Sequence, residues 1–332
     1  MVHSMRRFFS LKAILAIVVT VLSVFVVVKV HRIDKHLSSL ARGTKGFSPS
    51  NIMCEFPHNP AWEVAANDDQ ITLVNMMTQQ PFRWLNKGYQ ACAFESGDGE
   101  YVIKFFNQQR LREKPFLEKP LEYLFNEKFR VKASLTQKHR EEIFSSSKLA
   151  YEVFPEESGF VFVHLNRTED LFRGIKLIDM KGQVHKVRPD ATSFIIQKKA
   201  TYVLPTLTVL MKEGNVEGAK KRLDQIFDLL LSLAKKGVTD SDYALIRNNN
   251  IGFTKDRAIY IDTGHITKNP NLDIRKQMDY EFKRRLKPLY EWIRFSYPDL
   301  AQYYDMRRHD ILTHLTDHLA DEETKTLATA AK

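Results

Sequence analysis

Residues 237–266 read GVTDSDYALIRNNNIGFTKDRAIYIDTGHI, and this stretch determines how the rest of the chain is interpreted. Two acids, Asp240 and Asp242, come first and are followed by three consecutive amides that end at Asn250. A short apolar pair, a polar turn and a second apolar run then lead to Asp262. Mg²⁺ prefers hard oxygen ligands, typically one or two carboxylates or amides beside phosphate oxygens. The order of acids, amide, hairpin and strand-end acid therefore suits a site that holds a divalent metal on a phosphate. The alternative is a polar loop and a strand that ends in an Asx turn.

The stretch resembles the catalytic and metal-binding loops of the protein-kinase-like superfamily. That family carries a loop Asp, an Asn a few residues later, a β-hairpin and an Asp-x-Gly at the end of the hairpin. By position, the resemblance implies that Asn250 and Asp262 are the metal-binding residues. The middle Phe of the familiar Asp-Phe-Gly is Thr263 in this chain.

The catalytic acid departs from the family pattern. The family places it five residues before the Asn, where this chain has Leu245. Asp242 lies eight residues before Asn250, Asp240 lies ten before it, and the His-Arg that precedes the acid in many kinases is missing. A loop longer by three residues could still present Asp242. Asp242 and Asp240 are therefore the candidates for orienting or deprotonating an acceptor hydroxyl.

The other half of the candidate site lies upstream, in residues 82–106. Apolar and polar residues alternate there around a Ser-Gly-Asp-Gly turn signal, which predicts two antiparallel strands and a third. Lys104 stands alone among four apolar neighbours, so it either reaches solvent or points at a charge. The resemblance implies that Lys104 contacts the α- and β-phosphates of ATP. Residues 85–91 resemble the Gly-rich phosphate loop, in which Gly88 is the remaining glycine and the small Ala91 permits close approach.

The region between residues 125 and 154 is helical in composition. In the resembling family this helix supplies a glutamate that pairs with the strand lysine. The candidates for this pairing are Glu141, Glu142 and Glu152. The sequence does not choose among them, and each also suits a solvated helix face.

Further strands are predicted at residues 159–165, at 175–187 with a turn at Met180-Lys181-Gly182, and at 192–197. They fit the remaining strands of a five-stranded N-lobe, followed by a hinge from Gln197 to Ala200 where an adenine base would bond to the backbone. His164 and His185 are not accompanied in the sequence by other potential metal ligands, and they are interpreted as surface or strand histidines.

An amphipathic helix from Asn215 to Lys236 leads directly into the acidic loop, with apolar residues at helical spacing and Gly237 as the stop signal. Helices are also predicted at residues 273–296 and 300–319. No activation segment ending in Ala-Pro-Glu is present. This absence favours a smaller-molecule phosphotransferase or an atypical kinase over a typical protein kinase.

Composition limits the other classes of function. The chain has 332 residues, 43% of them hydrophobic, and a net charge of +10. Its basic residues are spread along the chain rather than gathered on one face, so we expect no nucleic-acid partner. The two cysteines, Cys54 and Cys92, form neither a disulfide framework nor a metal-ligand pattern, which is typical of a reducing compartment.

The apolar run from Ala13 to Val28 carries no charge and is flanked by lysines. It predicts an N-terminal membrane anchor, and a cleavable signal peptide is the alternative. Basic residues are more numerous after the run than before it, which favours a single-pass protein with its main domain in the cytoplasm.

The sequence thus predicts an α+β, two-lobed, protein-kinase-like fold behind a transmembrane helix. The expected organisation is an anchor at 1–30, a linker at 31–61, an N-lobe at 62–200, a C-lobe at 201–320 and a flexible tail at 321–332. We expect an enzyme that uses ATP and Mg²⁺ to phosphorylate an alcohol on an unidentified protein or small molecule. Two alternatives remain: a pseudokinase that binds nucleotide or acts as a scaffold, and a non-kinase α+β protein in which Lys104 and Asp262 are never neighbours.

Overall fold

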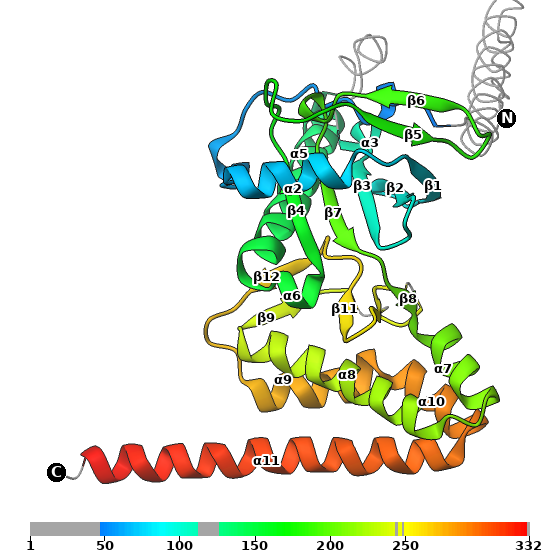
Figure 1. The fold of residues 1–332 in the computed structure, drawn as a ribbon. Coiled ribbons are helices and arrows are strands. Elements are labelled where there is room, and N and C mark those ends of the chain that lie inside the picture. The colour runs from blue at the N-terminus through cyan, green and yellow to red at the C-terminus, as the bar shows by residue number, and fades with distance from the viewer. Residues whose placement is uncertain (1–46, 112–125, 243–244, 248, 331–332) are drawn as a thin grey trace, which may run out of the picture. The chain divides into compact units, whose positions relative to one another are not determined.

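The computed structural model describes residues 47–111, 126–242, 245–247 and 249–330, and of residues 109–110, 126–136 and 318–330 it describes only the backbone. Residues 48–332 belong to one compact unit and residues 1–47 to another. The unit that starts at Ser48 has a sheet-rich first part and a helical second part (Figure 1), which is compatible with the predicted α+β class. The predicted anchor lies outside the described residues. Among the helices that are described, none is both long enough and apolar enough to cross a membrane.

The elements follow one another in a simple order. The sheet-rich part contains η1 (Pro49–Asn51), η2 (Pro60–Trp62), α2 (Asp68–Met77), β1 (Phe82–Lys87), β2 (Ala91–Ser96), β3 (Tyr101–Phe106), α3 (Gln108–Leu111), α5 (Asn126–Val153), α6 (Pro155–Ser158), β4 (Phe160–His164), β5 (Ile175–Ile178), β6 (Val184–Val187), η5 (Pro189–Ala191) and β7 (Phe194–Lys198). The helical part contains β8 (Thr201–Tyr202), α7 (Val203–Lys212), α8 (Val216–Lys235), β9 (Val238–Asp240), β10 (Ile251–Phe253), β11 (Ala258–Tyr260), β12 (Ile266–Lys268), α9 (Ile274–Tyr280), the π-helix η6 (Glu281–Arg285), α10 (Lys287–Ser296) and α11 (Pro298–Ala330).

The main sheet, as far as the structure describes it, has seven strands in the order β4-β7-β3-β2-β1-β5-β6. β1 pairs with β5 in parallel, and the other neighbours are antiparallel. Five strands were expected. The difference arises because the segment 175–187 folds back at its glycine turn, so that Ile178 pairs with Val184 and a hairpin extends the sheet beyond β1.

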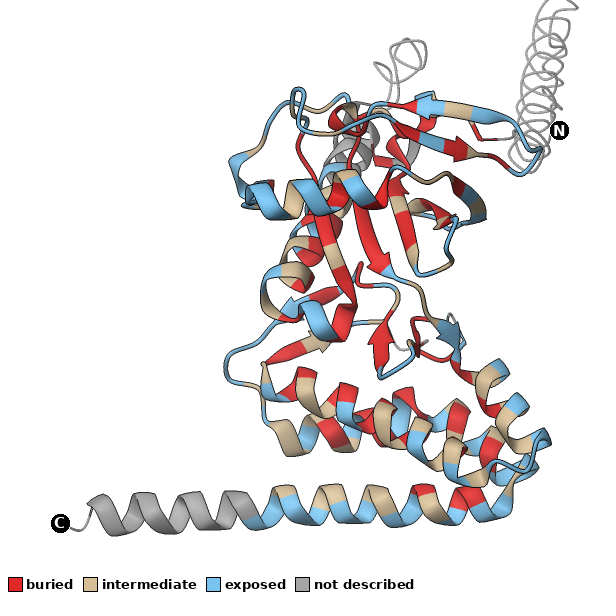
Figure 2. Ribbon diagram, viewed as in Figure 1, coloured by how far each residue is buried: buried red, intermediate tan, exposed pale blue. Residues whose placement is uncertain are grey.

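The sheet packs against α5 through a cluster of aromatic side chains. The rings of Trp62 and Phe144 lie 4.8 Å apart, and those of Phe106 and Phe144 lie 4.9 Å apart. In the helical part, Phe227 of α8 lies 5.2 Å from Phe282 and 5.0 Å from Tyr304. Figure 2 shows buried residues along β3, β4 and β7 and on the inner faces of these helices. The apolar stripe predicted for residues 215–236 is therefore the face of α8 that forms the core.

The boundaries of α8 are those that the sequence signals. The Asn215 side chain caps the helix by accepting a hydrogen bond from Gly218 N. The helix stops at Gly237, which has a φ of 68°, in the left-handed region. A β-carbon at Gly237 would also lie 2.6 Å from the carbonyl oxygen of Asn269, so both backbone conformation and space require glycine. This turn leads the chain into the acidic loop.

Three predicted boundaries differ from the structure. The compact unit begins at Ser48 rather than near Trp62, because Met53 pairs with Thr192 and Cys54 N donates to Ala191 O. The helix predicted at 273–296 is divided into α9, η6 and α10, and α11 continues to Ala330, into the predicted tail.

Candidate functional site

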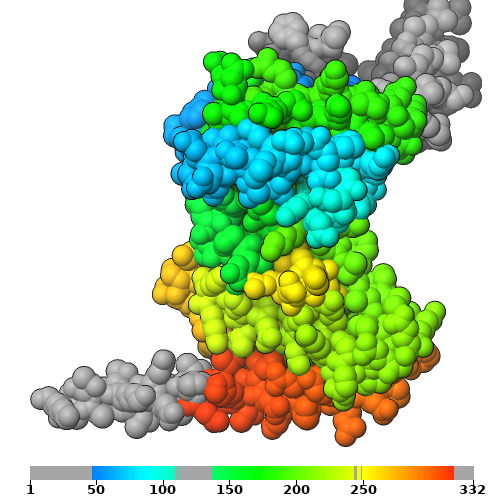
Figure 3. Space-filling view, in the orientation of Figure 1, coloured from blue at the N-terminus to red at the C-terminus, as the bar shows by residue number. Residues whose placement is uncertain are grey.

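A tight hairpin, β10–β11, brings the two predicted metal ligands to the same end. Its three residue pairs run from Ile251–Tyr260 to Phe253–Ala258, and all of these residues are buried. Asn250 precedes β10 and Asp262 follows β11. The carbonyl oxygen of Asn250 accepts hydrogen bonds from Ile261 N at 2.6 Å and Asp262 N at 3.3 Å. Figure 3 shows this part of the chain, in yellow, between the sheet-rich part and the helices.

The acidic loop lies against Asn250. The Asn250 side-chain amide donates to Asp242 Oδ2 at 2.8 Å, and Asp242 is half-buried. Asp240 has a different environment, because Arg285 donates to its Oδ2 and the Asp242 backbone N–H donates to its Oδ1. Burial raises the pKa of the Asp240 carboxyl, and the Arg285 guanidinium opposes that rise. The structure therefore directs Asp240 into the interior and leaves Asp242 beside the predicted metal ligand.

Asp262 is exposed, and its turn is fixed by its neighbours. Asp262 Oδ1 accepts a hydrogen bond from Gly264 N at 3.1 Å. The buried Thr263 offers its carbonyl oxygen to the Ser146 hydroxyl of α5. The same hydroxyl accepts from Ile266 N at 3.0 Å. Ser146 thus ties α5 to this segment, a contact that the sequence analysis missed.

The Lys104 side chain extends from the sheet to the segment that carries Asp262. It lies on β3 between Ala93 of β2 and Ile195 of β7, and its Nζ donates to the carbonyl oxygen of Ile261. Burial lowers the pKa of Lys104 to about 8, and the nearby Asp262 carboxylate acts in the opposite direction. Lys104 and Asp262, predicted to face each other, are therefore neighbours in the structure.

The loop between β1 and β2 reaches the Asp262 turn. Gly88 N donates to Ala91 O at 2.9 Å, so these two residues close the loop. The Gln90 side chain lies against Gly264, where an added β-carbon would be 2.6 Å from Gln90 Oε1. Gln90 is a second residue that the sequence analysis missed, although it stands between the two loop residues that were singled out.

The glutamates of α5 do not take the expected position. Glu142, one of the three candidate partners of Lys104, has a half-exposed side chain whose Oε1 lies 3.9 Å from Lys138 Nζ. Glu141 accepts from Gln137, and Glu152 lies 3.8 Å from Lys148. The physical reason is the helix face: Ile143, Phe144 and Ser146 are buried and occupy the inward side of α5. Among the described residues, none of the three glutamates is seen to bond to Lys104.

The Gln197 side chain is buried and bonded within the protein. It is 2% exposed, and its backbone pairs with Val102 on one side and Phe160 on the other. Its Nε2 donates to Ser158 O at 2.6 Å and to Tyr260 O at 2.7 Å. The expectation that an adenine base would bond to the backbone between Gln197 and Ala200 stays a prediction.

The donors present are suitable for Mg²⁺. Asn250 Oδ1 and Asp262 Oδ2 are hard oxygens, and the described residues supply neither with a hydrogen bond in the structure. The part of the chain that is described contains no group of three or more His, Cys, Asp or Glu side chains that could bind a metal by themselves. A Mg²⁺ site here would therefore take its remaining ligands from phosphate oxygens or water, as is usual for this ion.

Comparisons with known proteins add little to this geometry. No protein-family model matches the chain, and no curated protein matches it. Solved structures of WbdD, described as a bifunctional kinase-methyltransferase, are similar to part of it. Three of them have 17%, 16% and 16% identity and TM-scores of 0.32, 0.34 and 0.34. The similar region covers 60%, 70% and 67% of this chain but only 37%, 46% and 48% of those chains. A similarity at this level carries no argument about the fold or the function of this chain.

Proposed function

We propose that this chain is an ATP-dependent phosphotransferase with a two-lobed, protein-kinase-like fold that transfers the γ-phosphoryl group to an alcohol acceptor. The observation that carries the proposal is the convergence of one amine and three oxygen-bearing side chains from separate segments. Lys104 lies beside Asp262, the backbones of Asp262 and Asn250 are bonded, and the Asn250 side chain contacts Asp242. A phosphate-binding cation, two metal ligands and a candidate base are the components that phosphoryl transfer requires.

Each residue has a distinct role in this proposal. Lys104 contacts the phosphates of ATP. Asn250 and Asp262 hold Mg²⁺, which when bound neutralises part of the phosphate charge. Asp242 orients the acceptor hydroxyl and accepts its proton, and Asp240 is too deeply buried to do so. Positioning and electrostatic stabilisation supply most of the catalysis in sites of this kind.

A nucleotide-binding module without transfer, a pseudokinase, is the second candidate. Two observations favour it: Gln90 lies against Gly264, and Lys104 is bonded to a main-chain carbonyl where the resembling family uses a glutamate. A non-kinase protein in which Lys104 and Asp262 are far apart is disfavoured by the same Lys104 contact.

Thermal unfolding with Mg-ATP, combined with transfer assays over a panel of protein, sugar, lipid and nucleotide acceptors, tests the proposal. A ligand that binds only the folded state raises the melting temperature. We expect Mg-ATP to do so for the wild-type chain and for Glu142→Ala, a surface control on α5. Lys104→Ala and Asp262→Ala should remove the shift and abolish turnover. A shift without transfer to any acceptor would favour the pseudokinase, and full activity in either variant would contradict the assignment.

The proposal includes a membrane anchor formed by residues 13–28, with the catalytic unit on the cytoplasmic side. The uncharged apolar sequence and the excess of basic residues after it support this orientation. Extraction of the full chain from membranes by detergent but not by alkaline carbonate is the expected result. Release by carbonate would contradict the anchor without affecting the proposed chemistry.

A further inference from the structure

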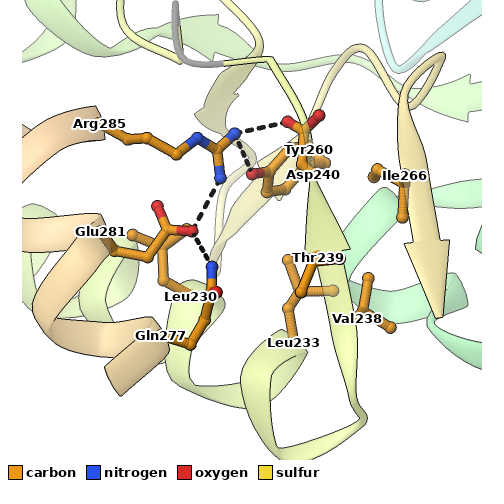
Figure 4. A pocket seen from close by; sticks show the side chains of 10 residues that line it. All are labelled: Leu230, Leu233, Val238, Thr239, Asp240, Tyr260, Ile266, Gln277, Glu281 and Arg285. Atoms are coloured by element: carbon orange, nitrogen blue, oxygen red, sulfur yellow. Dashed lines mark hydrogen bonds and ion pairs between the residues drawn. The ribbon is translucent and has the colours of Figure 1, made fainter. Parts of the chain in front are cut away.

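Arg285, at the end of η6, is a charged residue in the interior of the helical part. It is 1% exposed, and it is among the largest fully buried side chains of the described residues. Figure 4 shows its guanidinium between Asp240, Tyr260 and Glu281. Its Nη2 donates to Asp240 Oδ2 at 2.5 Å and to the Tyr260 hydroxyl at 2.8 Å, and its Nη1 donates to Glu281 Oε1 at 2.9 Å.

One further bond connects this cluster to the acidic loop. Arg285 Nε donates to the backbone carbonyl oxygen of Asp242 at 2.9 Å. The backbone N–H of Asp242 donates to Asp240 Oδ1, also at 2.9 Å. Both backbone polar groups of Asp242 are therefore held by the Arg285–Asp240 pair. The Asp242 side chain points to the Asn250 amide, 2.8 Å away.

The local helix geometry explains how Arg285 reaches the loop. Leu286 N donates to Glu281 O, five residues earlier, which is the bond of a π-turn. Single π-turns occur frequently at functional sites. Here the turn directs Glu281 and Arg285 inward together, and Gln277 of α9 donates to the same Glu281 oxygen at 2.8 Å.

A cluster of this kind is not needed to stabilise the core. Burying an arginine and two carboxylates carries a large desolvation cost, and well-packed apolar residues often replace buried ion pairs without loss of stability. The bonds from Arg285 and Asp240 do, however, hold the backbone N–H and C=O groups of Asp242. A requirement for loop geometry explains why charged groups occupy this position.

We propose that Arg285 is a positioning residue for Asp242, acting through the Asp242 carbonyl and through Asp240. The inference rests on the proposed function, because Asp242 is the candidate base of that reaction. It also gives Asp240 a role: Asp240 transmits the position of Arg285 to the Asp242 backbone and does not itself contact the acceptor.

Steady-state kinetics of Arg285→Lys and Asp240→Asn in the full chain test this role. Arg222→Lys is the matched control, because Arg222 also donates to a backbone carbonyl. Its acceptor is Thr254 O, 3.0 Å away, in the turn of the β10–β11 hairpin. Misplacement of a reacting group by about 1 Å can cost about 100-fold in rate. We expect both test variants to lower kcat roughly 10- to 100-fold with little change in KM for ATP, and the control to retain its kcat. Folded test variants with an unchanged kcat, or with a change only in KM, would overturn the proposal.

Hydrogen exchange of the Asp242 backbone amide, which donates to Asp240 Oδ1, gives a second measurement that needs no activity. Asp240→Asn changes the size of the side chain very little. It therefore serves as the test variant if Arg285→Lys does not fold. We expect faster exchange of this amide for Asp240→Asn and unchanged exchange for Arg222→Lys. Equal exchange in both would overturn the positioning role. A wild-type chain without turnover would overturn the proposed function instead, and the exchange rates would then decide whether Arg285 holds the loop.

Discussion

The side chain of Asn250 donates a hydrogen bond of 2.8 Å to Asp242 Oδ2, joining two residues that stand eight positions apart in the chain. The bond uses the nitrogen of the amide and leaves its oxygen for another partner. Asn250 can therefore orient the candidate base and bind a metal ion at the same time. An aspartate at this position could not do both, because it has no N–H group to donate.

Replacing Asn250 by Asp separates these two tasks. Asn250→Asp keeps an oxygen ligand but places a carboxylate against Asp242, so we expect Mn²⁺ binding to persist while kcat falls about 100-fold or more. Asn250→Ala should lose both Mn²⁺ binding and activity. Mn²⁺ titration followed by electron paramagnetic resonance measures the first property, and steady-state kinetics measures the second. Loss of metal binding without loss of rate would contradict the assignment.

Gly252, in the middle of β10, should tolerate no side chain. A β-carbon there would lie 2.5 Å from the backbone oxygen of Thr201 and 2.8 Å from Ile261 Cδ1. Overpacking of this kind costs about 1–3 kcal/mol, so we expect Gly252→Ala to lower the free energy of unfolding by that amount. At the control position Gly88, the nearest atom to an added β-carbon is 3.7 Å away. Gly88→Ala should change stability by no more than about 0.5 kcal/mol in the same urea titration. Equal effects of the two substitutions would argue against the close approach of β8 and β10.

His164 should make the fold sensitive to acid. Its Nδ1 lies 2.8 Å from Thr192 O and its Nε2 3.1 Å from the Thr168 hydroxyl. Burial lowers the pKa of His164 to about 4 from 6.5, while the Thr192 bond and the Asp190 charge act in the opposite direction. The folded state therefore favours the neutral ring. This contribution to stability is complete above pH 6.5 and is lost as the pH falls from there towards 4.

Urea unfolding at pH 7.5 and pH 5 measures this effect. Between these values the wild-type chain should lose about 2 kcal/mol through His164 alone. His164→Gln, which does not titrate, should show a pH-dependent loss smaller by that amount. The same loss in both proteins would show that His164 is not the group responsible.

The sequence predicts the order of elements well because local signals dominate there. The helix predicted from Asn215 to Lys236 has an apolar stripe, a capping side chain and a glycine directly after it, and α8 begins and ends within one residue of that range. The turn after Ser96 and the hairpin after Asn250 are also local features, and both are present. Each of these elements depends on residues that are close in the chain.

Long-range contacts are where the prediction fails. Nothing near Gln197 in sequence indicates that its amide is bonded to Tyr260 O, and nothing near Glu142 shows that Ser146 occupies the inward helix face instead. The sequence does contain an indication that Arg285 is buried, because it follows Phe282 by three residues and so lies on the buried face of its helix. A charge on an apolar helix face predicts a buried partner, but only the fold shows that the partner is the acidic loop.

The Gln197 amide has a mechanical consequence. It joins the end of β7, through Tyr260 O, to the strand that leads into Asp262. The same amide also donates to Ser158 O, so one buried side chain links the sheet, the end of α6 and the β10–β11 hairpin. Lys104 on β3 pairs with Ile195, two residues before Gln197 on β7, and Asp262 follows the strand that Gln197 holds, so the two candidate residues are coupled through hydrogen bonds on both sides.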